Sequence, residues 1–159
     1  MEQLTDDSDR TMNLKILEGG PTIYAKKYNS CKINGYKFNI EKHDEILTTQ
    51  NSGVLVLGNN GAETIIYYGV LNEIIEVAFF SGRQVVLFKC RWFDIHHKNR
   101  GIKVDKYGYV SINMNRSLQT QMHEPFIKAS QAQQVFYSTD MASRLGWKIV
   151  TPINLRYSN

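Results

Sequence analysis

Short apolar stretches separated by turn residues dominate the chain from Ile23 onward. Residues 33–38 (INGYKF) place an Asn-Gly dipeptide between apolar residues, which is a strong signal for a β-hairpin. Residues 54–57 (VLVL) predict a short strand, and residues 58–61 (GNNG) predict a turn after it. The polar segment 41–52 between these elements predicts a loop or a short helical turn.

The centre of the chain predicts two long strands joined by a turn. Residues 64–80 are rich in β-branched and aromatic side chains, and Gly69 within them indicates a bend or a bulge. A turn at 81–82 (Ser-Gly) leads into a returning strand at 84–94. We therefore expect residues 72–80 and 84–94 to pair antiparallel.

The second half of the returning strand alternates in polarity. Phe88, Cys90 and Trp92 would share one face, while Lys89 and Arg91 point the other way, because successive side chains of a strand face opposite sides. This pattern predicts a strand with one buried face and one basic face.

The remaining patterns complete a mainly β prediction. Further strands are expected at 103–112, 134–137 and 147–151, with a helical turn within 125–133. Because no long segment has the 3.6-residue period of a helix, the fold class is mainly β, as a small antiparallel barrel or a sandwich. Residues 1–20 predict a flexible acidic lead-in that ends at Gly-Gly-Pro (19–21), and 21–159 predict a single β domain with an N-terminal β extension.

Composition narrows the class of protein. The 159 residues are 42% hydrophobic and 21% charged, which is typical of a globular chain. No run of 18 apolar residues predicts a membrane span, and the acidic start does not resemble a secretory signal. Two cysteines, Cys31 and Cys90, are too few for a disulfide framework, so we expect both to be reduced in an intracellular protein.

The net charge of +4 is unevenly distributed. Residues 1–20 carry −3 and 41–82 carry −5, whereas 21–40 carry +4, 83–106 carry +5 and 107–159 carry +3. The basic blocks are either solvated faces of strands and loops or a surface for an anionic partner such as nucleic acid.

Several blocks resemble a known family, with the similarity strongest over 51–151. They are 50–54 (QNSGV), 67–71 (YYGVL), 85–94 (VVLFKCRWFD), 101–108 (GIKVDKYG), 125–127 (PFI) and 129–137 (ASQAQQVFY). Together they resemble the domain of unknown function found C-terminal to the transposase in plant CACTA (En/Spm-type) elements. Arg91 departs from that family, in which an acidic residue is common at this position. The resemblance implies a nuclear, transposon-derived accessory domain whose catalytic partner domain lies elsewhere, so no enzymatic activity is expected.

A second similarity concerns architecture. Residues 67–93 and 134–140 are similar to segments of bromo-adjacent homology (BAH) domains, which are SH3-like barrels that read chromatin. This similarity implies binding of a histone tail or another chromatin protein. It places Tyr67 and Trp92 on positions of an aromatic cage for methyl-lysine, and a third position falls on Asp94, which is not aromatic. The competing interpretation is that Trp92 packs in the core beside Phe88 and Cys90.

A nucleic-acid surface is the main alternative. No helix-turn-helix, zinc-finger or RRM motif is present, but Tyr107 and Tyr109 follow a basic stretch and would stack on bases. A self-association surface used in transposase assembly is a third possibility. The basic residues of the DNA-binding alternative are Arg83, Lys89, Arg91, Lys98, Arg100, Lys103 and Lys106.

Metal and catalytic signatures are weak. Cys90, His96 and His97, with Cys31 or His43, have no spacing typical of structural zinc. The acidic residues are scattered, and neither a phosphate-binding glycine loop nor a nucleophile elbow occurs. We therefore predict no metal, no cofactor and no catalytic residues.

Overall fold

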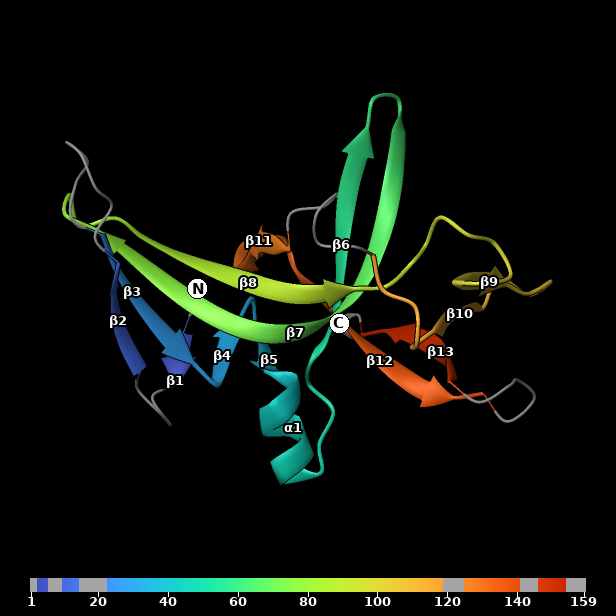
Figure 1. Ribbon diagram of the computed structural model, residues 1–159, viewed down its shortest axis with the longest axis horizontal. Helices are drawn as coiled ribbons and strands as arrows, with labels where there is room; N and C mark the ends of the chain where they lie inside the picture. The colour runs from blue at the N-terminus through green and yellow to red at the C-terminus, as the bar shows by residue number, and fades with distance from the viewer. Residues whose placement is uncertain (1–2, 6–9, 15–22, 119–124, 141–145, 154–159) are drawn as a thin grey trace, which may run out of the picture.

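The computed structural model describes residues 3–5, 10–14, 23–118, 125–140 and 146–153. These ranges are mainly β (Figure 1). They contain one α-helix, α1 (Glu41–Leu47), and a short 3-10 helix, η1 (Ala129–Gln131). The strands are β1 (Gln3–Thr5), β2 (Arg10–Leu14), β3 (Ile23–Tyr28), β4 (Ser30–Ile33), β5 (Tyr36–Asn39), β6 (Gly53–Asn60), β7 (Glu63–Phe79), β8 (Gln84–Trp92), β9 (Ile102–Val104), β10 (Val110–Asn113), β11 (Phe126–Lys128), β12 (Gln133–Thr139) and β13 (Trp147–Pro152).

The named strands pair antiparallel in two sheets. A small sheet has the order β1-β4-β5, and a large sheet has the order β11-β8-β7-β6-β12-β13-β10-β9, with β3 also on β7 and β2 on β3. The mainly β, antiparallel prediction is confirmed. The large sheet runs in an open order, and its end strands β11 and β9 do not pair with each other in the described ranges.

Strand β7 organises the large sheet. Its first half forms a projecting hairpin with β6, and its second half lies between β3 and β8 (Figure 1). The predicted antiparallel pairing of 72–80 with 84–94 is confirmed, from Ala78 opposite Gln84 to Gly69 opposite Trp92. The register shifts between Leu71 and Glu73, so the irregularity falls at Asn72 rather than at Gly69.

Both faces of this sheet are buried where β6, β7 and β8 meet. Neighbouring residues belong alternately to two core clusters: Leu71 and Trp92 lie in one, and Val70 and Phe93 in the other. The predicted burial of Phe88 with Cys90 and Trp92 is confirmed, because all three are in the first cluster. The sheet is therefore a central layer between two apolar clusters.

One predicted turn is confirmed and another lies at different residues. The Asn-Gly hairpin joins β4 to β5, and both Asn34 and Gly35 have positive φ, as a type I′ turn requires. Residues 58–60 are not a turn as predicted; they continue β6, because its pairing with β7 extends to the last residue before Gly61. The turn is Gly61-Ala62, in which glycine supplies a φ of +68°.

Other segments also differ from the sequence pattern. Residues 103–112 are not one strand but the hairpin β9–β10, with a turn between them. The short helical turns expected within 41–52 and 125–133 are confirmed as α1 and η1, and the difference is that strand β11 precedes η1. Within the expected lead-in, β1 pairs with β4 and β2 pairs with β3, because this backbone finds ladder partners in the N-terminal strands. The Gly-Gly-Pro segment 19–21 lies outside the described residues.

No helix in the described ranges is long and apolar enough to cross a membrane.

Candidate functional site

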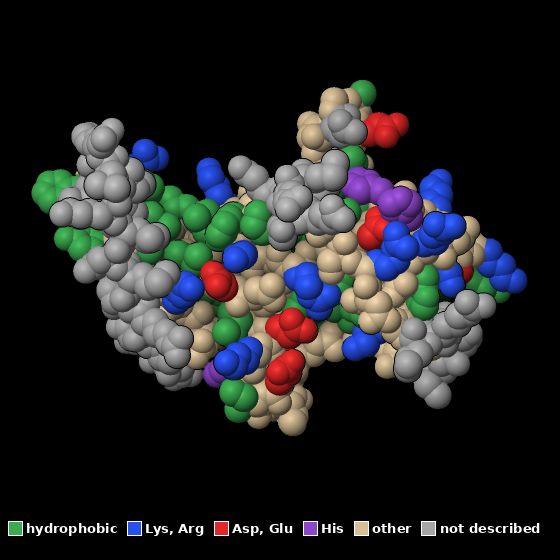
Figure 2. Space-filling view, in the orientation of Figure 1, with side chains coloured by type: hydrophobic (Ala, Val, Ile, Leu, Met, Phe, Trp, Pro, Cys, Tyr) green, Lys and Arg blue, Asp and Glu red, His purple; other side chains and the backbone are tan. Residues whose placement is uncertain are grey.

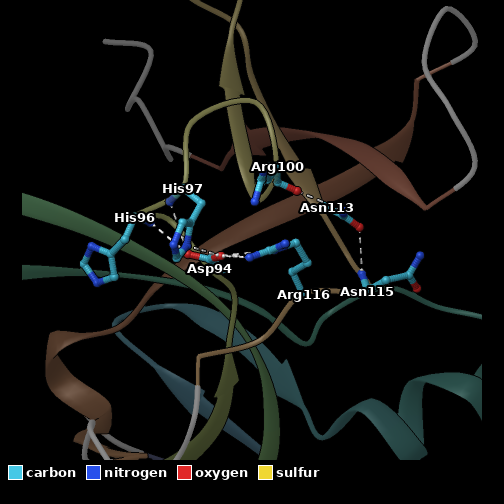
Figure 3. Close-up of polar contacts among 7 residues, drawn as sticks. All are labelled: Asp94, His96, His97, Arg100, Asn113, Asn115 and Arg116. Atoms are coloured by element: carbon cyan, nitrogen blue, oxygen red, sulfur yellow. Dashed lines mark hydrogen bonds and ion pairs between the residues drawn. The ribbon is translucent and has the colours of Figure 1, made fainter.

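Asp94 anchors a network of polar contacts just beyond the end of β8. Its carboxylate accepts hydrogen bonds from the backbone N–H groups of His96 (3.0 Å) and His97 (3.3 Å). It is also 2.8 Å from Nδ1 of His97 and accepts a bond from Nε of Arg116 at 3.1 Å (Figure 3). A carboxylate two residues before the N–H groups it binds forms an Asx-type turn, so Asp94 fixes the start of the loop 95–101.

The environment of Asp94 keeps its carboxylate charged. Burial acts to raise the pKa of Asp94, but the hydrogen bonds from His96, His97 and Arg116 outweigh it and leave the pKa below its ordinary value. Arg116 adds a second contact, from its NH2 group at 3.0 Å. Gly101 closes the loop against the backbone, because a Cβ there would lie 2.1 Å from the Asp94 carbonyl oxygen.

The segment around Arg116 is tied to the same loop (Figure 3). The Asn113 side-chain amide donates to the Arg100 carbonyl at 3.0 Å, and Asn113 Oδ1 accepts from the backbone N–H of Asn115 at 3.0 Å. The loop 95–101 and the turn after β10 are therefore held together by side-chain contacts at both ends.

This construction gathers positive charge at one end of the molecule. Residues 95–118, here called the basic end, contain five Lys or Arg and one Asp, a net charge of +4. Figure 2 shows Lys and Arg side chains crowded beside two histidines at this end. Lys98 and Arg100 are exposed, and Lys103 Nζ lies 4.1 Å from the centroid of the Trp147 ring. Such a concentration of cations suits an anionic partner.

Two tyrosines project from the tip of the basic end. Tyr107 is 75% exposed and Tyr109 is 62% exposed. Asp105 Oδ1 accepts hydrogen bonds from the backbone N–H groups of both tyrosines, at 2.8 and 2.9 Å. The turn between β9 and β10 is therefore organised by one carboxylate, which is why the strand predicted over 103–112 is interrupted.

The aromatic pair Tyr67 and Trp92 lines a separate pocket of about 250 Å³. The two ring centroids are 6.5 Å apart and the rings meet edge to face at 72°. Trp92 is only 7% exposed and belongs to the core cluster, whereas Tyr67 is half-buried. The pocket is mainly apolar; its other lining residues are Val56, Leu57, Gly58, Leu118, Ile127 and Gln131.

The structure brings together two of the three expected cage residues. Tyr67 and Trp92 share the pocket, but Asp94 does not line it, because its carboxylate is engaged with His97 and Arg116. His96 connects the two regions, since its ring centroid lies 6.4 Å from that of Tyr67. The pocket and the basic end are therefore adjacent but chemically distinct.

The seven basic residues of the nucleic-acid alternative do not form one surface. Lys98, Arg100, Lys103 and Lys106 belong to the basic end. Arg83 belongs to the connection between β7 and β8, and Figure 1 shows this connection at the opposite end of the long axis.

Two basic residues of β8 lie between these ends. Lys89 Nζ is 5.9 Å from the Phe126 ring centroid. Arg91 Nη1 donates to the Met114 carbonyl at 3.3 Å, and Arg91 Nη2 is 3.7 Å from Oε1 of Glu41. Arg91 is therefore partly committed to contacts within the molecule.

Sequence reasoning missed Arg116 and the role of His97. The signal that marks them is Asp94 placed two and three residues before His96 and His97, the spacing of an Asx turn. The pairing with Arg116, 22 residues later, depends on the fold. Within the described ranges, no group of three or more His, Cys, Asp or Glu side chains is placed to hold a metal ion.

Comparison with known proteins identifies one similarity. Residues 75–150, from the second half of β7 into β13, match a family described as a domain of unknown function (DUF4216). A match to a domain of unknown function is therefore confirmed over this region. Its description specifies no activity, ligand or origin, so the resemblances to the CACTA-associated domain and to BAH domains stay predictions. No curated protein and no solved structure matches the chain.

Proposed function

We propose that the chain is a non-catalytic accessory domain that binds nucleic acid through its basic end. The observation that carries this proposal is the net charge of +4 over 95–118, presented on a loop and a hairpin that Asp94 and Asp105 hold in place. Lysine and arginine bind phosphate and release its counterions, and this supplies much of the affinity for nucleic acid.

The proposed biological setting comes from the family resemblance. The blocks over 51–151 that resemble the accessory domain of plant CACTA transposases support the proposal of a transposon-derived, nuclear protein. A domain that accompanies a transposase would meet DNA and chromatin. Binding, rather than catalysis, is the role proposed for it.

The test is a salt titration of DNA binding with paired charge variants. Fluorescence anisotropy with a labelled DNA oligonucleotide should show affinity falling steeply between about 50 and about 200 mM salt. The logarithmic slope should be roughly −3 to −4 if the four cations other than Arg116, which is paired with Asp94, contact phosphates. Removing Lys98 and Arg100 together by Lys98→Ala and Arg100→Ala should flatten that slope by about 2.

Arg83→Ala is the matched control, because it removes one positive charge at the opposite end of the molecule. Its slope and affinity should equal those of the unmodified protein. Absence of salt-dependent binding at low salt would refute the proposal, and so would an equal loss in the Arg83→Ala variant.

A second candidate function is recognition of a methyl-lysine in a histone tail. The observation that favours it is that Tyr67 and Trp92 line one pocket of side-chain size. Two rings would supply cation–π attraction, but the remaining walls are mainly aliphatic, and among the described residues no carboxylate lines the pocket. The pocket therefore supports this function less strongly than the basic end supports nucleic-acid binding.

Peptide binding separates the two functions. A trimethyl-lysine peptide should bind more tightly than its unmethylated form, with little salt dependence, and Tyr67→Ala should remove the difference. Tyr67 is the better probe because it is half-buried, whereas truncating the buried Trp92 would also destabilise the core. Equal binding of both peptides would exclude the methyl-lysine function.

A further inference from the structure

We infer that the nucleic acid bound by the basic end is single-stranded, and that its unpaired bases stack on Tyr107 and Tyr109. The inference rests on the proposed function and adds the class of substrate. Its basis is the exposure, rigidity and charge of the turn between β9 and β10.

The two rings have little contact with their own protein. Tyr107 is 75% exposed and Tyr109 is 62% exposed, although tyrosine is usually at least partly buried. Both lie on one five-residue turn, 105–109. Exposed aromatic faces stack on bases of any sequence, a contact that single-strand-binding proteins use repeatedly.

The backbone that carries these rings is fixed before any ligand arrives. Asp105 Oδ1 accepts from the N–H groups of Tyr107 and Tyr109, and the Asp105 N–H donates to the Tyr109 carbonyl at 3.0 Å. The Gly108 N–H donates to the Asp105 carbonyl at 3.1 Å, and Gly108 has a φ of +88°, which glycine adopts without strain. A preformed turn loses less conformational entropy on binding than a flexible one.

Lysine side chains lie close to both tyrosine rings. Lys106 Nζ is 5.0 Å from the centroid of the Tyr107 ring. Tyr109 and Lys103 both line a groove of about 510 Å³, whose other lining residues include the carboxylates of Asp105 and Asp140. The phosphates are therefore expected beside Lys106 and Lys103 at the rim, and not inside the groove. A base on a ring would therefore place its phosphates near a lysine, which combines stacking with charge neutralisation.

Duplex DNA would not use these features. Its bases are stacked on one another, so their faces are not available to a tyrosine ring. Sequence readout in the major groove requires a helix or a β-ribbon that fits it. The basic end does contain a β-ribbon, β9–β10, whereas α1 is seven residues long and lies outside it. The two exposed tyrosine rings, and not the absence of a ribbon, therefore favour a single strand over a duplex.

The experiment compares three labelled probes of about 12 nucleotides, a length within the range of single-strand binding sites. They are oligo-thymidine, a duplex of equal length, and an abasic strand that keeps the phosphates and lacks bases. The unmodified protein should bind oligo-thymidine more tightly than either other probe. Tyr107→Ala and Tyr109→Ala should each weaken oligo-thymidine binding by roughly 5- to 150-fold, with no change for the abasic strand.

Tyr24→Ala is the matched control, because Tyr24 is 50% exposed but lies on β3, away from the basic end. It should leave all three affinities unchanged, and Tyr107→Phe and Tyr109→Phe should retain binding because they keep the ring. Thermal melts of each variant check that the fold survives.

Different results would overturn nucleic-acid binding by the basic end and its preference for a single strand. Salt-dependent binding with no preference for oligo-thymidine, or with Tyr→Ala variants that bind normally, would overturn the single-strand inference and leave the nucleic-acid function in place. Tighter binding of the duplex would also overturn it. Absence of binding to every probe would overturn both.

Discussion

Asp94 is a negatively charged side chain that organises a mainly positively charged surface, the basic end. It is 5% exposed, yet it stays ionised because two backbone N–H groups, His97 and Arg116 surround its carboxylate. Replacing the carboxylate by an amide would keep one acceptor oxygen but put an NH2 group opposite the remaining donors, and an unsatisfied buried group is costly. Asp94 therefore supports the basic end without needing to contact a ligand.

Asp94→Asn should lower the free energy of unfolding at pH 7 by about 1–3 kcal/mol. Because the pKa of Asp94 is lowered in the folded state, its stabilisation is present above the ordinary aspartate pKa of about 3.9 and is lost as pH falls toward the folded-state value. Urea unfolding at neutral and acidic pH should therefore show the gap between the two proteins closing below about pH 4.

Asp105→Asn, which changes an exposed carboxylate, should show a smaller loss at pH 7. If the difference in free energy of unfolding between the unmodified protein and Asp94→Asn stays constant as the pH falls below about 4, the Asp94 charge is not its cause.

At the scale of elements, the β7–β8 pair depends on a glycine opposite a tryptophan. A Cβ at Gly69 would lie 2.7 Å from Cε3 of Trp92 and 2.9 Å from the Arg91 carbonyl oxygen. The Gly69 carbonyl also accepts a 2.8 Å hydrogen bond from the buried Tyr137 hydroxyl on β12. The glycine is therefore needed for close packing, and this explains its place in the middle of a long strand.

Gly69→Ala should destabilise the protein by about 1–3 kcal/mol, the usual cost of overpacking a core. Part of that cost should disappear when Trp92→Phe provides room, because the stability effects of substitutions at residues in contact do not simply add. A double-mutant cycle measured by chemical denaturation tests the coupling. If the losses of stability from Gly69→Ala and Trp92→Phe simply add, the Trp92 ring is not what excludes the alanine methyl group.

At the scale of the whole molecule, the core lies on both faces of the central strands. Cys31 on β4 and Cys90 on β8 are both buried in the first cluster. Burial raises the pKa of the Cys90 thiol well above its ordinary value, so the reactive thiolate is scarce at neutral pH. Access to these thiols therefore reports on opening of the core.

Thiol titration should count two reactive groups in unfolded, unreduced protein and react only slowly with the native protein. The reason is that both sulfur atoms become accessible only when the core opens. Two fast-reacting thiols in the native state would contradict the packing described for the core. A count of none after unfolding would contradict the prediction that both cysteines are reduced.

The sequence by itself determined the fold class and many of its local elements. Asn34-Gly35 specified a hairpin because both residues tolerate positive φ, and alternation in β8 specified which side chains would be buried. These features depend on neighbours in sequence, so a local pattern is sufficient to predict them. The turn at 105–109 also depends on neighbours in sequence, because the Asp105 carboxylate binds backbone N–H groups within it. The pattern of hydrophobic residues does not reveal such a turn.

Tertiary structure alone decided which candidate residues act together. It placed Arg116 on Asp94 across 22 residues. It also put the β7–β8 connection, which contains Arg83, at the far end of the long axis, although Arg83 lies close in sequence to the other basic residues. It also kept Trp92 buried beside Tyr67, while Asp94 turned toward the basic end. The physical reason is that long-range strand register and the twist of β7 set these distances, and neither is encoded in the spacing of residues along the chain.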